Sequence, residues 1–506
     1  MTKKNMFLLI LDGLRADRAS CYGYSRKTTP YIDLLAKQGI LFSNCYGVSH
    51  SSFPCHISLF TGVHPYFHGA ASNFSYYNNQ LPYLTEKLQK QNYKTIGISS
   101  YNSYHSIESG FLRYFDKYIK VMKSNSYMKK PLKPKFKHGH NMIDLTGLSD
   151  FAKKIWSKIK YSSFKAKADF YLKNDMGGKK IIDQIKKQFD LCYGSDEPFF
   201  LFANILETHT PFLPIGKFRN YFKKINLTKT LLNAFFNPHL FETGRAPLSS
   251  EEQEALNALY DGGVRYADSL VEELFSYLDE KGYLDNTTVI ITSDHGEMLN
   301  EQDSLIGHGS STYEGMIKLP LIILDSPKRN QGMITREDLV SQVDIFPTIV
   351  NIAGGTLDRN IFKYKCKDLL KNDETSRFVI CESPATAFPE RLYGYPEIME
   401  RWGHVERTII EKPYKFIWRS NGNHCLYDLS VDKIEKNNLF RKADPGIIKE
   451  LICKMVLWYK EQCGDEDFFS LECFDYQKTR WPGKPVEDLI VTQDEGNIEV
   501  VQDEIR

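Results

Sequence analysis

The chain has 506 residues, enough for one large catalytic domain with an appended unit or for up to three ordinary domains. Its 65 basic and 63 acidic residues nearly cancel, so the overall charge indicates neither a nucleic-acid-binding protein nor an acidic, disordered chain. The composition is that of a globular protein, and no run reaches the roughly 18 consecutive apolar residues that span a bilayer. We therefore expect a folded protein without a transmembrane segment and without nucleic acid as a partner.

Short apolar runs alternate with helical patterns along most of the chain. In chain order, the apolar runs predict strands at Phe7–Leu11, Ile40–Phe42, Thr95–Ser99, Pro198–Leu206, Thr288–Thr292 and Leu319–Leu324. Helical patterns lie between them at Tyr31–Gln38, Leu81–Gln91, Lys179–Phe189 and Ala267–Lys281. This alternation predicts an α/β fold with a large mixed, mostly parallel sheet sandwiched by helices. Ligands of such sheets gather at the carboxyl ends of the strands, so polar residues there are the first candidates for a functional site.

A different pattern follows Gly355. Short strands separated by turns are predicted at Phe378–Cys381, Arg407–Ile410, Tyr414–Trp418 and His424–Leu429. They indicate a smaller C-terminal α+β subdomain built on an antiparallel sheet. We therefore divide the chain into a catalytic α/β domain at 1–375, this subdomain at 376–464, and a tail at 465–506 that is packed on the surface or partly disordered.

A basic insertion interrupts the first domain at about 117–175. Fourteen lysines and two aspartates lie between Lys117 and Lys167, a local excess of +12 in a chain of net charge +2. Phe151, Ile155 and Ile159 recur every four residues, which predicts an amphipathic helix with a basic face. Two interpretations are open: a solvated surface excursion, or a collar that attracts an anionic substrate.

The cysteines and the N-terminal residues bear on the cellular compartment. The ten cysteines are scattered and form no CxxC pair, which fits neither a zinc ribbon nor a small disulfide scaffold. The apolar run Met6–Leu11 is too short for a signal peptide and has no small-residue cleavage site after it. We expect a cytoplasmic protein with reduced thiols.

Two of the predicted strands end in groups that bind metal ions. Asp12 follows the first strand, and Asp294 and His295 follow the strand that ends at Thr292. Asp12 alone would fit a turn or a helix cap, but burying all three groups without a partner would be unfavourable. Carboxylates and neutral imidazoles are ordinary ligands of Zn²⁺, Mn²⁺ or a related ion. A divalent metal site at this edge of the sheet is therefore predicted.

Ser52 lies where a loop should lead into a helix. Its hydroxyl would face a helix N-terminus, which is a natural site for an anion. Contact with a metal ion would lower the pKa of this hydroxyl and make it a nucleophile. The simpler interpretation, Ser51 or Ser52 as an N-cap, is strong for this segment taken alone.

Together these segments resemble the sulfatase family of the alkaline phosphatase superfamily, from about residue 5 to 440. The N-terminal signature is Leu11-Asp12-Gly13-Leu14-Arg15, and Thr61-Gly62 with His68-Gly69 is similar to the close of the family's nucleophile motif. The later matches are Thr208-His209-Thr210-Pro211, Ser293-Asp294-His295-Gly296-Glu297, His308-Gly309, Val343-Asp344-Ile345-Phe346-Pro347-Thr348 and, near the C-terminus, Leu426-Tyr427-Asp428-Leu429.

The resemblance assigns roles by position. It implies that Asp12, Ser52, Asp294 and His295 hold one divalent ion, with Mn²⁺, Zn²⁺ or Ca²⁺ expected and Mg²⁺ also open, and that Ser52 is the nucleophile. His209 and His308 would contact the charged group of the substrate or protonate the leaving oxygen. We assign His56 and Asn102 to substrate binding together with these two histidines.

Several positions depart from the family pattern. In the Ser52-Phe53-Pro54-Cys55-His56 motif, a histidine replaces the arginine that accompanies oxidation to formylglycine, so we expect Ser52 to be unmodified. The second aspartate of the usual pair is Gly13, and the Asp294-His295 pair is closer to phosphonate monoester and phosphodiester hydrolases. Ser52-Phe53-Pro54 also resembles nucleotide pyrophosphatase/phosphodiesterases, two-zinc enzymes with an extra aspartate four residues before a histidine. That position, before His209, is Ile205 here, which favours one metal ion.

The sequence thus predicts a metal-dependent hydrolase of sulfate or phosphate-type esters, including monoesters, diesters and phosphonates, with a covalent intermediate on Ser52. A phosphoryl or sulfuryl transferase acting on a glycan or lipid is the alternative among enzymes. A non-catalytic binder of anionic glycans is the alternative outside them, although such a binder needs no nucleophile. The expected partner is an anionic ester, with a sulfated or phosphorylated glycan as one candidate.

Overall fold

A computed structural model gives the structure of the chain. It describes residues 3–121, 150–236, 247–325, 332–357, 366–371, 377–383, 403–463 and 499–502, apart from short gaps at 74, 76, 78–80, 101–104, 107–108, 196, 303–304 and 310. Among these residues, no helix combines the length and the apolar character needed to cross a membrane.

A nine-stranded sheet forms the centre of the molecule, in the order β12-β2-β11-β7-β1-β6-β4-β5-β18. Its strands are β1 (Asn5–Leu11), β2 (Ile40–Phe42), β4 (Lys94–Ser99), β5 (Lys117–Lys120), β6 (Phe199–Ile205), β7 (Thr287–Thr292), β11 (Leu321–Leu324), β12 (Ile334–Arg336) and β18 (Glu499–Gln502). β11 pairs antiparallel with both of its neighbours, and every other pair in this sheet is parallel. The predicted mixed, mostly parallel sheet is confirmed.

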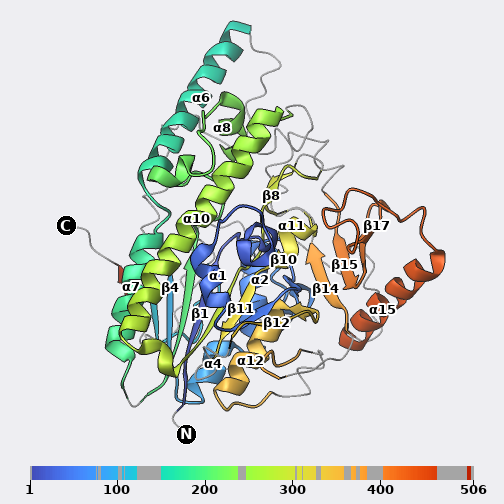
Figure 1. Cartoon of the computed structure of the whole chain (residues 1–506). Coiled ribbons are helices and arrows are strands. Elements are labelled where there is room, and N and C mark those ends of the chain that lie inside the picture. Colours follow the sequence, from blue (N-terminus) through green and yellow to red (C-terminus); the bar gives the residue numbers. More distant parts are fainter. Residues whose placement is uncertain are drawn as a thin grey trace, which may run out of the picture.

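Both faces of this sheet are covered, which explains why its central strands are apolar throughout. On β1, Phe7, Leu9 and Leu11 belong to one core cluster, and Met6, Leu8 and Ile10 belong to the other. The first cluster includes residues of α1 (Pro30–Ala36), α7 (Gly178–Cys192), α8 (Lys229–Phe236) and α10 (Ser250–Glu280). The second includes residues of α2 (Ser52–Thr61), α4 (Leu84–Gln89) and α12 (Ile345–Ile352), so helices cover the sheet on both sides (Figure 1).

The helix starts have local causes. α10 begins with a capping box, in which the Ser249 hydroxyl and the Glu252 carboxylate each satisfy the other's backbone N–H. α1 begins at Pro30, and the Asp268 carboxylate of α10 accepts hydrogen bonds from the next two backbone amides, at 2.8 Å for Ile32. One buried aspartate therefore fixes α1 against α10 as well as capping it.

The parallel register brings the functional residues to one edge. β1 lies between β6 and β7, with Leu11 opposite Ile205 and Ile10 opposite Thr292. The segments that follow all three strands therefore emerge side by side, and they carry Asp12, His209 and Asp294.

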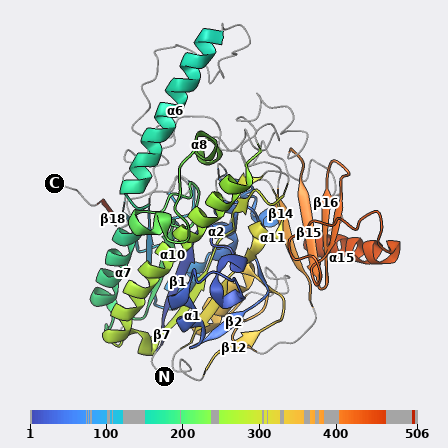
Figure 2. The same cartoon turned by 45° about the horizontal axis from the view of Figure 1, so that its top comes forward.

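A four-stranded antiparallel sheet lies to one side of the main sheet, as the predicted smaller unit requires (Figures 1 and 2). Its strands are β14 (Val379–Ser383), β15 (Glu406–Glu411), β16 (Tyr414–Arg419) and β17 (Cys425–Asp428). A helix for which we predicted no boundaries, α15 (Pro445–Cys463), packs on this sheet through Leu451, Met455 and Tyr459. These residues recur every four positions, so a helical pattern was present in the sequence.

One predicted strand is divided in the structure. Leu319–Leu324 separates into β10 (Lys318–Leu319) and β11 at Pro320. β10 pairs with β3 (Cys45–Tyr46) in a three-stranded sheet with β13 (Val340–Ser341), while β11 enters the main sheet. Proline has no N–H for a strand ladder, and it lies at the point where the chain passes between the two sheets.

The remaining elements are short, apart from one helix. α3 (Pro65–His68) and α11 (Glu314–Ile317) are single turns, and β8 (Met298–Leu299) pairs with β9 (Ile306–Gly307). The helix predicted in the basic insertion is present as α6 (Asp150–Lys173) and projects beyond the rest of the molecule in both views (Figures 1 and 2). Residues 122–149 of the insertion, with many of its lysines, lie outside the described residues.

Candidate active site and metal centre

Asp12, Asp294 and His295 meet at the carboxyl edge of the central strands. All three side chains are fully buried, and one ligand atom from each lies within 4.8 Å of the others. His295 Nε2 is 3.5 Å from Asp294 Oδ2 and 3.9 Å from Asp12 Oδ1. Gly13 turns the chain directly after Asp12 with a φ of +79°, a conformation that favours glycine.

In each of the two carboxylates, one oxygen accepts a hydrogen bond and the other has no hydrogen-bond partner among the described residues. Asp12 Oδ2 accepts a hydrogen bond from Asn204 Nδ2 at 3.0 Å, and Asp294 Oδ1 accepts one from the His295 amide at 2.9 Å. Asp12 Oδ1 and Asp294 Oδ2 are buried and have no hydrogen-bond partner among the described residues.

This arrangement favours a bound cation. Burial, reinforced by the carboxylate of Asp294, raises the pKa of Asp12 to about 8, which reflects the difficulty of placing two negative groups together in a dry site. A divalent ion would remove that difficulty and would satisfy both open oxygens. The residues present therefore fit a metal ion with oxygen and imidazole ligands.

Ser52 is the first residue of α2 and faces this group. Its Oγ lies 2.9 Å from His295 Nε2, and its side chain is almost completely buried. The preceding Ser51 is the N-cap and has extended backbone, but its hydroxyl makes no capping hydrogen bond. At this helix start the Phe53 N–H donates to Asn73 Oδ1 at 2.7 Å, Pro54 has no N–H, and the Cys55 N–H donates to the Ser51 carbonyl at 3.3 Å, so the predicted anion site at the helix N-terminus stays a prediction. The structure brings all four predicted metal-site residues together.

His56 lies one helical turn after Ser52, inside the protein. Its Nδ1–H donates to the Ser52 carbonyl at 2.7 Å, and Nδ1 is 3.8 Å from Asp294 Oδ2. Its ring contacts His105, Phe111 and Phe202 edge-on, and burial lowers its pKa. His56 thus belongs to an aromatic cluster next to Ser52, and a substrate contact remains a prediction. Asn102, the other residue assigned to substrate binding, lies outside the described residues.

His209 and His308 line the open side of the site. The ring centroid of His308 is 4.6 Å from that of His209 and 4.4 Å from that of His295. Their side chains are 20% and 9% exposed, whereas Ser52 and the three predicted metal ligands are buried, so these two histidines are the more exposed residues of the site. Burial alone would lower the pKa of His209, but the carboxylates of Asp12 and Glu297 outweigh it and raise that pKa.

Two residues of the site were not assigned from the sequence. Glu297 is fully buried, and its carboxylate lies 3.2 Å from His308 Nδ1 while accepting a hydrogen bond from the Thr210 amide. Asn204 is a polar residue at the end of an apolar strand, and this irregularity was the available signal for it. Glu297 also explains Gly13, because a Cβ at residue 13 would lie 3.1 Å from Glu297 Cγ and 3.2 Å from the Thr208 carbonyl oxygen.

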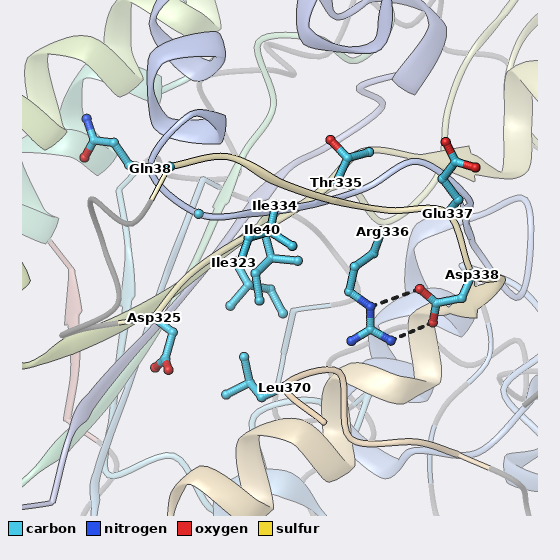
Figure 3. A pocket seen from close by; sticks show the side chains of 12 residues that line it. Gln38, Ile40, Ile323, Asp325, Ile334, Thr335, Arg336, Glu337, Asp338 and Leu370 are labelled. Carbon is cyan, nitrogen blue, oxygen red and sulfur yellow. Dashed lines mark hydrogen bonds and ion pairs between the residues drawn. The ribbon is translucent and has the colours of Figure 1, made fainter. Parts of the chain in front are cut away.

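A separate cavity of about 640 Å³ lies away from these groups (Figure 3). Ile40 and Ile334, the first residues of β2 and β12, contribute to it, as does Asp325 after the antiparallel β11. These positions are at the amino-terminal edge of the parallel strands, opposite the carboxyl edge. The Arg336 guanidinium in this cavity is already paired with Asp338, at 2.8 Å. It is therefore not part of the candidate active site.

Comparisons with known proteins show the family and the fold of the chain. The sulfatase family model matches residues 4–355. An arylsulfatase of Clostridium perfringens is 22% identical over 474 residues, covering 87% of this chain and 91% of the relative. An N-acetylgalactosamine-6-O-sulfatase of Bacteroides thetaiotaomicron is 24% identical over 511 residues, covering 89% and 92% of the two chains. The crystal structure of the phosphonate monoester hydrolase of Agrobacterium radiobacter aligns with a TM-score of 0.62 at 18% identity, over 91% of this chain and 96% of that one.

Proposed function

Because the chain belongs to the sulfatase family and is an ester hydrolase, we propose that it is a metal-dependent enzyme that cleaves sulfate or phosphate-type esters through a covalent intermediate on Ser52. One observation carries this proposal. The Ser52 hydroxyl, at the start of α2, lies 2.9 Å from His295 Nε2 and beside two buried carboxylates, each with one oxygen that has no hydrogen-bond partner among the described residues.

The residues that would hold the ion are Asp12, Ser52, Asp294 and His295. A bound divalent cation supplies positive charge that lowers the pKa of a hydroxyl and stabilises charge on the ester oxygens. Zn²⁺ and Mn²⁺ suit this mixed set of oxygen and nitrogen ligands, whereas Ca²⁺ and Mg²⁺ would depend on the carboxylates and the Ser52 hydroxyl.

Side chains of this protein account for the two chemical steps, which are the attack by Ser52 and the hydrolysis of the covalent intermediate. Deprotonated Ser52 Oγ attacks the phosphorus or sulfur atom, and the bond to the leaving oxygen breaks. His209 or His308, both on the solvent side of the nucleophile, donates a proton to that oxygen. Water then attacks the same phosphorus or sulfur atom, which releases the product and restores Ser52.

Ser52 favours phosphate-type esters over sulfates. A serine-bound sulfate must wait for water to attack sulfur, whereas formylglycine can release its sulfate by collapse of a hemiacetal. His56 replaces the arginine of the modification motif and is buried against aromatic rings, so we propose that Ser52 is unmodified. Phosphate mono- and diesters and phosphonates are the preferred substrate classes in this proposal.

The molecule that carries the ester and the cellular location of the protein are also proposals. The similarity to an N-acetylgalactosamine-6-O-sulfatase supports an ester carried on a glycan. Eight of the ten cysteines are unpaired thiols in the structure, which supports the proposed cytoplasmic location.

The test is a substrate panel assayed with each metal in turn. Aryl sulfate, aryl phosphate, bis-aryl phosphate and aryl phosphonate would be supplied to the metal-stripped protein with Mn²⁺, Zn²⁺, Ca²⁺ or Mg²⁺. We expect metal-dependent turnover, highest for one of the phosphorus esters and lost in Ser52→Ala, with the neighbouring Ser51→Ala as the matched control that retains activity. Absence of turnover with every metal and substrate, or full activity of Ser52→Ala, would refute the proposal. An added sugar or lipid alcohol that captures the phosphoryl group in place of water would identify a transferase.

The state of Ser52 is tested separately by mass spectrometry. We expect a tryptic peptide that contains Ser52 to have its unmodified mass. An aldehyde at this residue would reverse the proposed preference and make sulfate esters the expected substrates.

A further inference from the structure

His50 is a buried histidine close to the candidate active site that the proposed mechanism does not use. Its side chain is completely buried, and in the described part of the chain neither Nδ1 nor Nε2 has a hydrogen-bond partner. Burying an imidazole in this way is unfavourable, because the ring gives up the hydrogen bonds that it makes to water in the unfolded chain. A bound group that satisfies the ring nitrogens would remove this cost, so the side chain indicates a ligand at this position.

The backbone directs His50 to the same side of the chain as the nucleophile. Ser51, between His50 and Ser52, has extended backbone with a φ of −146° and a ψ of 150°. Side chains alternate along extended backbone, so residues 50 and 52 lie on one side and residue 51 lies on the other. On the side of residue 52, Ser52 Oγ lies 2.9 Å from His295 Nε2.

The neighbouring charges place His50 on the flank of the site that His295 and His308 form. Burial lowers the pKa of His50 to about 3; the carboxylate of Glu406 opposes this shift, and His308 and His295 reinforce it. The rings of His295 and His308 are themselves stacked, with centroids 4.4 Å apart. His50 is therefore a neutral imidazole next to the candidate active site, with one N–H to donate and one nitrogen to accept.

Glu406, the carboxylate that acts on His50, is already engaged elsewhere. Its Oε1 accepts a hydrogen bond from Arg419 Nε at 2.8 Å. Its Oε2 accepts two hydrogen bonds from Thr312, one from the amide at 2.8 Å and one from the hydroxyl at 2.9 Å. Both carboxylate oxygens are thus satisfied without His50, which leaves the imidazole to a bound group.

The segment that carries His50 is fixed to the C-terminal sheet. Ser49 Oγ donates to the carbonyl of Glu382 in β14 at 2.9 Å, and the Glu382 amide donates to the Val48 carbonyl at 2.8 Å. These two hydrogen bonds hold the backbone directly before His50. A side chain that is held in place before the substrate arrives loses little conformational entropy on binding, as a binding residue requires.

We propose that His50 is a further substrate-binding residue, whose ring N–H donates a hydrogen bond to a non-bridging oxygen of the ester group that Ser52 attacks. The inference rests on the proposed function for the identity of this group as a phosphate-type or sulfate ester. A neutral donor suits an oxygen that carries negative charge during the attack, because it stabilises that charge without requiring a second buried charge in the protein.

The test is the affinity of the full chain, loaded with Mn²⁺ and freed of excess metal, for inorganic phosphate, measured by isothermal titration calorimetry. His50→Ala should weaken phosphate binding roughly 10- to 100-fold, the loss expected when a hydrogen bond to a charged group is removed. His50→Gln, which keeps an N–H donor, should recover part of this affinity. Metal content and thermal unfolding of both variants should match the wild type.

The matched control is His64→Ala. His64 lies beyond the other end of α2, and it is also buried with an Nε2 that has no hydrogen-bond partner in the part of the chain described. This variant should bind phosphate as the wild type does. Unchanged affinity in His50→Ala, or an equal loss in His64→Ala, would overturn the inference.

A crystal structure of the unsubstituted protein with tungstate guards against variants that fold poorly. Tungstate is a tetrahedral dianion whose anomalous signal locates it. We expect it next to Ser52, with one oxygen within hydrogen-bond distance of a His50 ring nitrogen. Tungstate next to Ser52 without this contact, or no bound tungstate at saturation, would overturn the inference. Ester turnover is not part of either readout, so anion binding by His50 and the proposed hydrolysis succeed or fail separately.

Discussion

Two groups of buried acidic residues in this protein differ in how their negative charge is balanced. In the first, Asp12 and Asp294 each have one buried carboxylate oxygen with no hydrogen-bond partner among the described residues. In the second, where the four-stranded sheet meets the catalytic unit, the buried Lys415 ammonium lies 2.7 Å from Glu435 and 3.2 Å from Glu314. A lysine of the chain supplies the cation of the second group, whereas no lysine or arginine of the described residues pairs with Asp12 or Asp294 in the first.

The difference separates a structural role from a functional one. A buried charge is tolerated when it is paired, so the group around Lys415 is complete without any ligand and joins two parts of the fold. In the group around Asp12, two carboxylates are buried close together without a lysine or arginine partner among the described residues. Such a pair is a suitable site for a bound metal ion. Substitutions in the two groups should therefore have opposite effects on metal binding and on stability.

The largest expected effect is a loss of turnover when a carboxylate of the first group is removed. Asp12→Ala or Asp294→Ala should lose the bound ion and reduce kcat/KM by roughly 10³-fold or more, because both the ligand set and its geometry are disrupted. Thermal stability of the metal-free protein should change little or rise, since a buried charge is removed. Elemental analysis that finds the ion retained in both variants would show that the metal site is assigned to the wrong residues.

The next largest effect is on stability in the second group. Lys415→Met should lower the free energy of unfolding by about 3–5 kcal/mol, because it leaves the Glu314 and Glu435 carboxylates buried without their cation. Urea unfolding measures the loss, and metal content should be unchanged. As a control, combining Lys415→Met with Glu314→Gln and Glu435→Gln should restore part of the stability. No destabilisation by Lys415→Met would show that this group is not structural.

A smaller effect on turnover is expected for a substitution of Glu297. This carboxylate is buried in the active site but paired, with the His308 ring and the Thr210 amide. Glu297→Gln keeps the shape and removes the charge, so we expect a 10- to 100-fold loss in kcat/KM, about 1.4–2.7 kcal/mol, through weaker orientation of the histidines. Steady-state kinetics measure this loss, and Glu301→Gln, at a neighbouring carboxylate, serves as the comparison. A variant with full activity would mean that Glu297 does not position the histidines.

The smallest effect concerns Glu207, an acid held by neither a metal nor a lysine. It accepts hydrogen bonds from the Met176 and Gly178 amides near the start of α7, and burial raises its pKa from 4.5 to about 8. The native state thus holds a proton that the unfolded chain releases, so this residue makes stability fall as the pH rises from about 4.5 to about 8. Glu207→Gln should therefore be more stable relative to the wild type at pH 8.5 than at pH 5, as measured by thermal unfolding. An equal difference at both pH values would contradict the raised pKa.

Much of the fold followed from short-range pattern. The apolar runs that became β1, β6 and β7 and the helices between them were predictable, because burial on both faces requires continuous apolar strands. The Ser52 position at a helix start and the Asp12 and Asp294 positions at strand ends were equally local features. The hydrophobic pattern was less informative at Pro320, where the chain passes from one sheet to another. The helix α15 was not predicted, although its apolar residues recur every four positions.

The sequence by itself determined which residues stand at the ends of the central strands and at the start of α2, since periodicity and turn residues act over a few positions. Only the tertiary structure decided which side chains surround them. Glu297 reaches His209 although 88 residues separate them, Asn204 fixes one oxygen of Asp12, and Lys415 neutralises Glu314 across the join to the C-terminal sheet. Such pairings depend on strand register and on how the two sheets pack, and these are set by burial of the whole apolar core rather than by any local stretch of sequence.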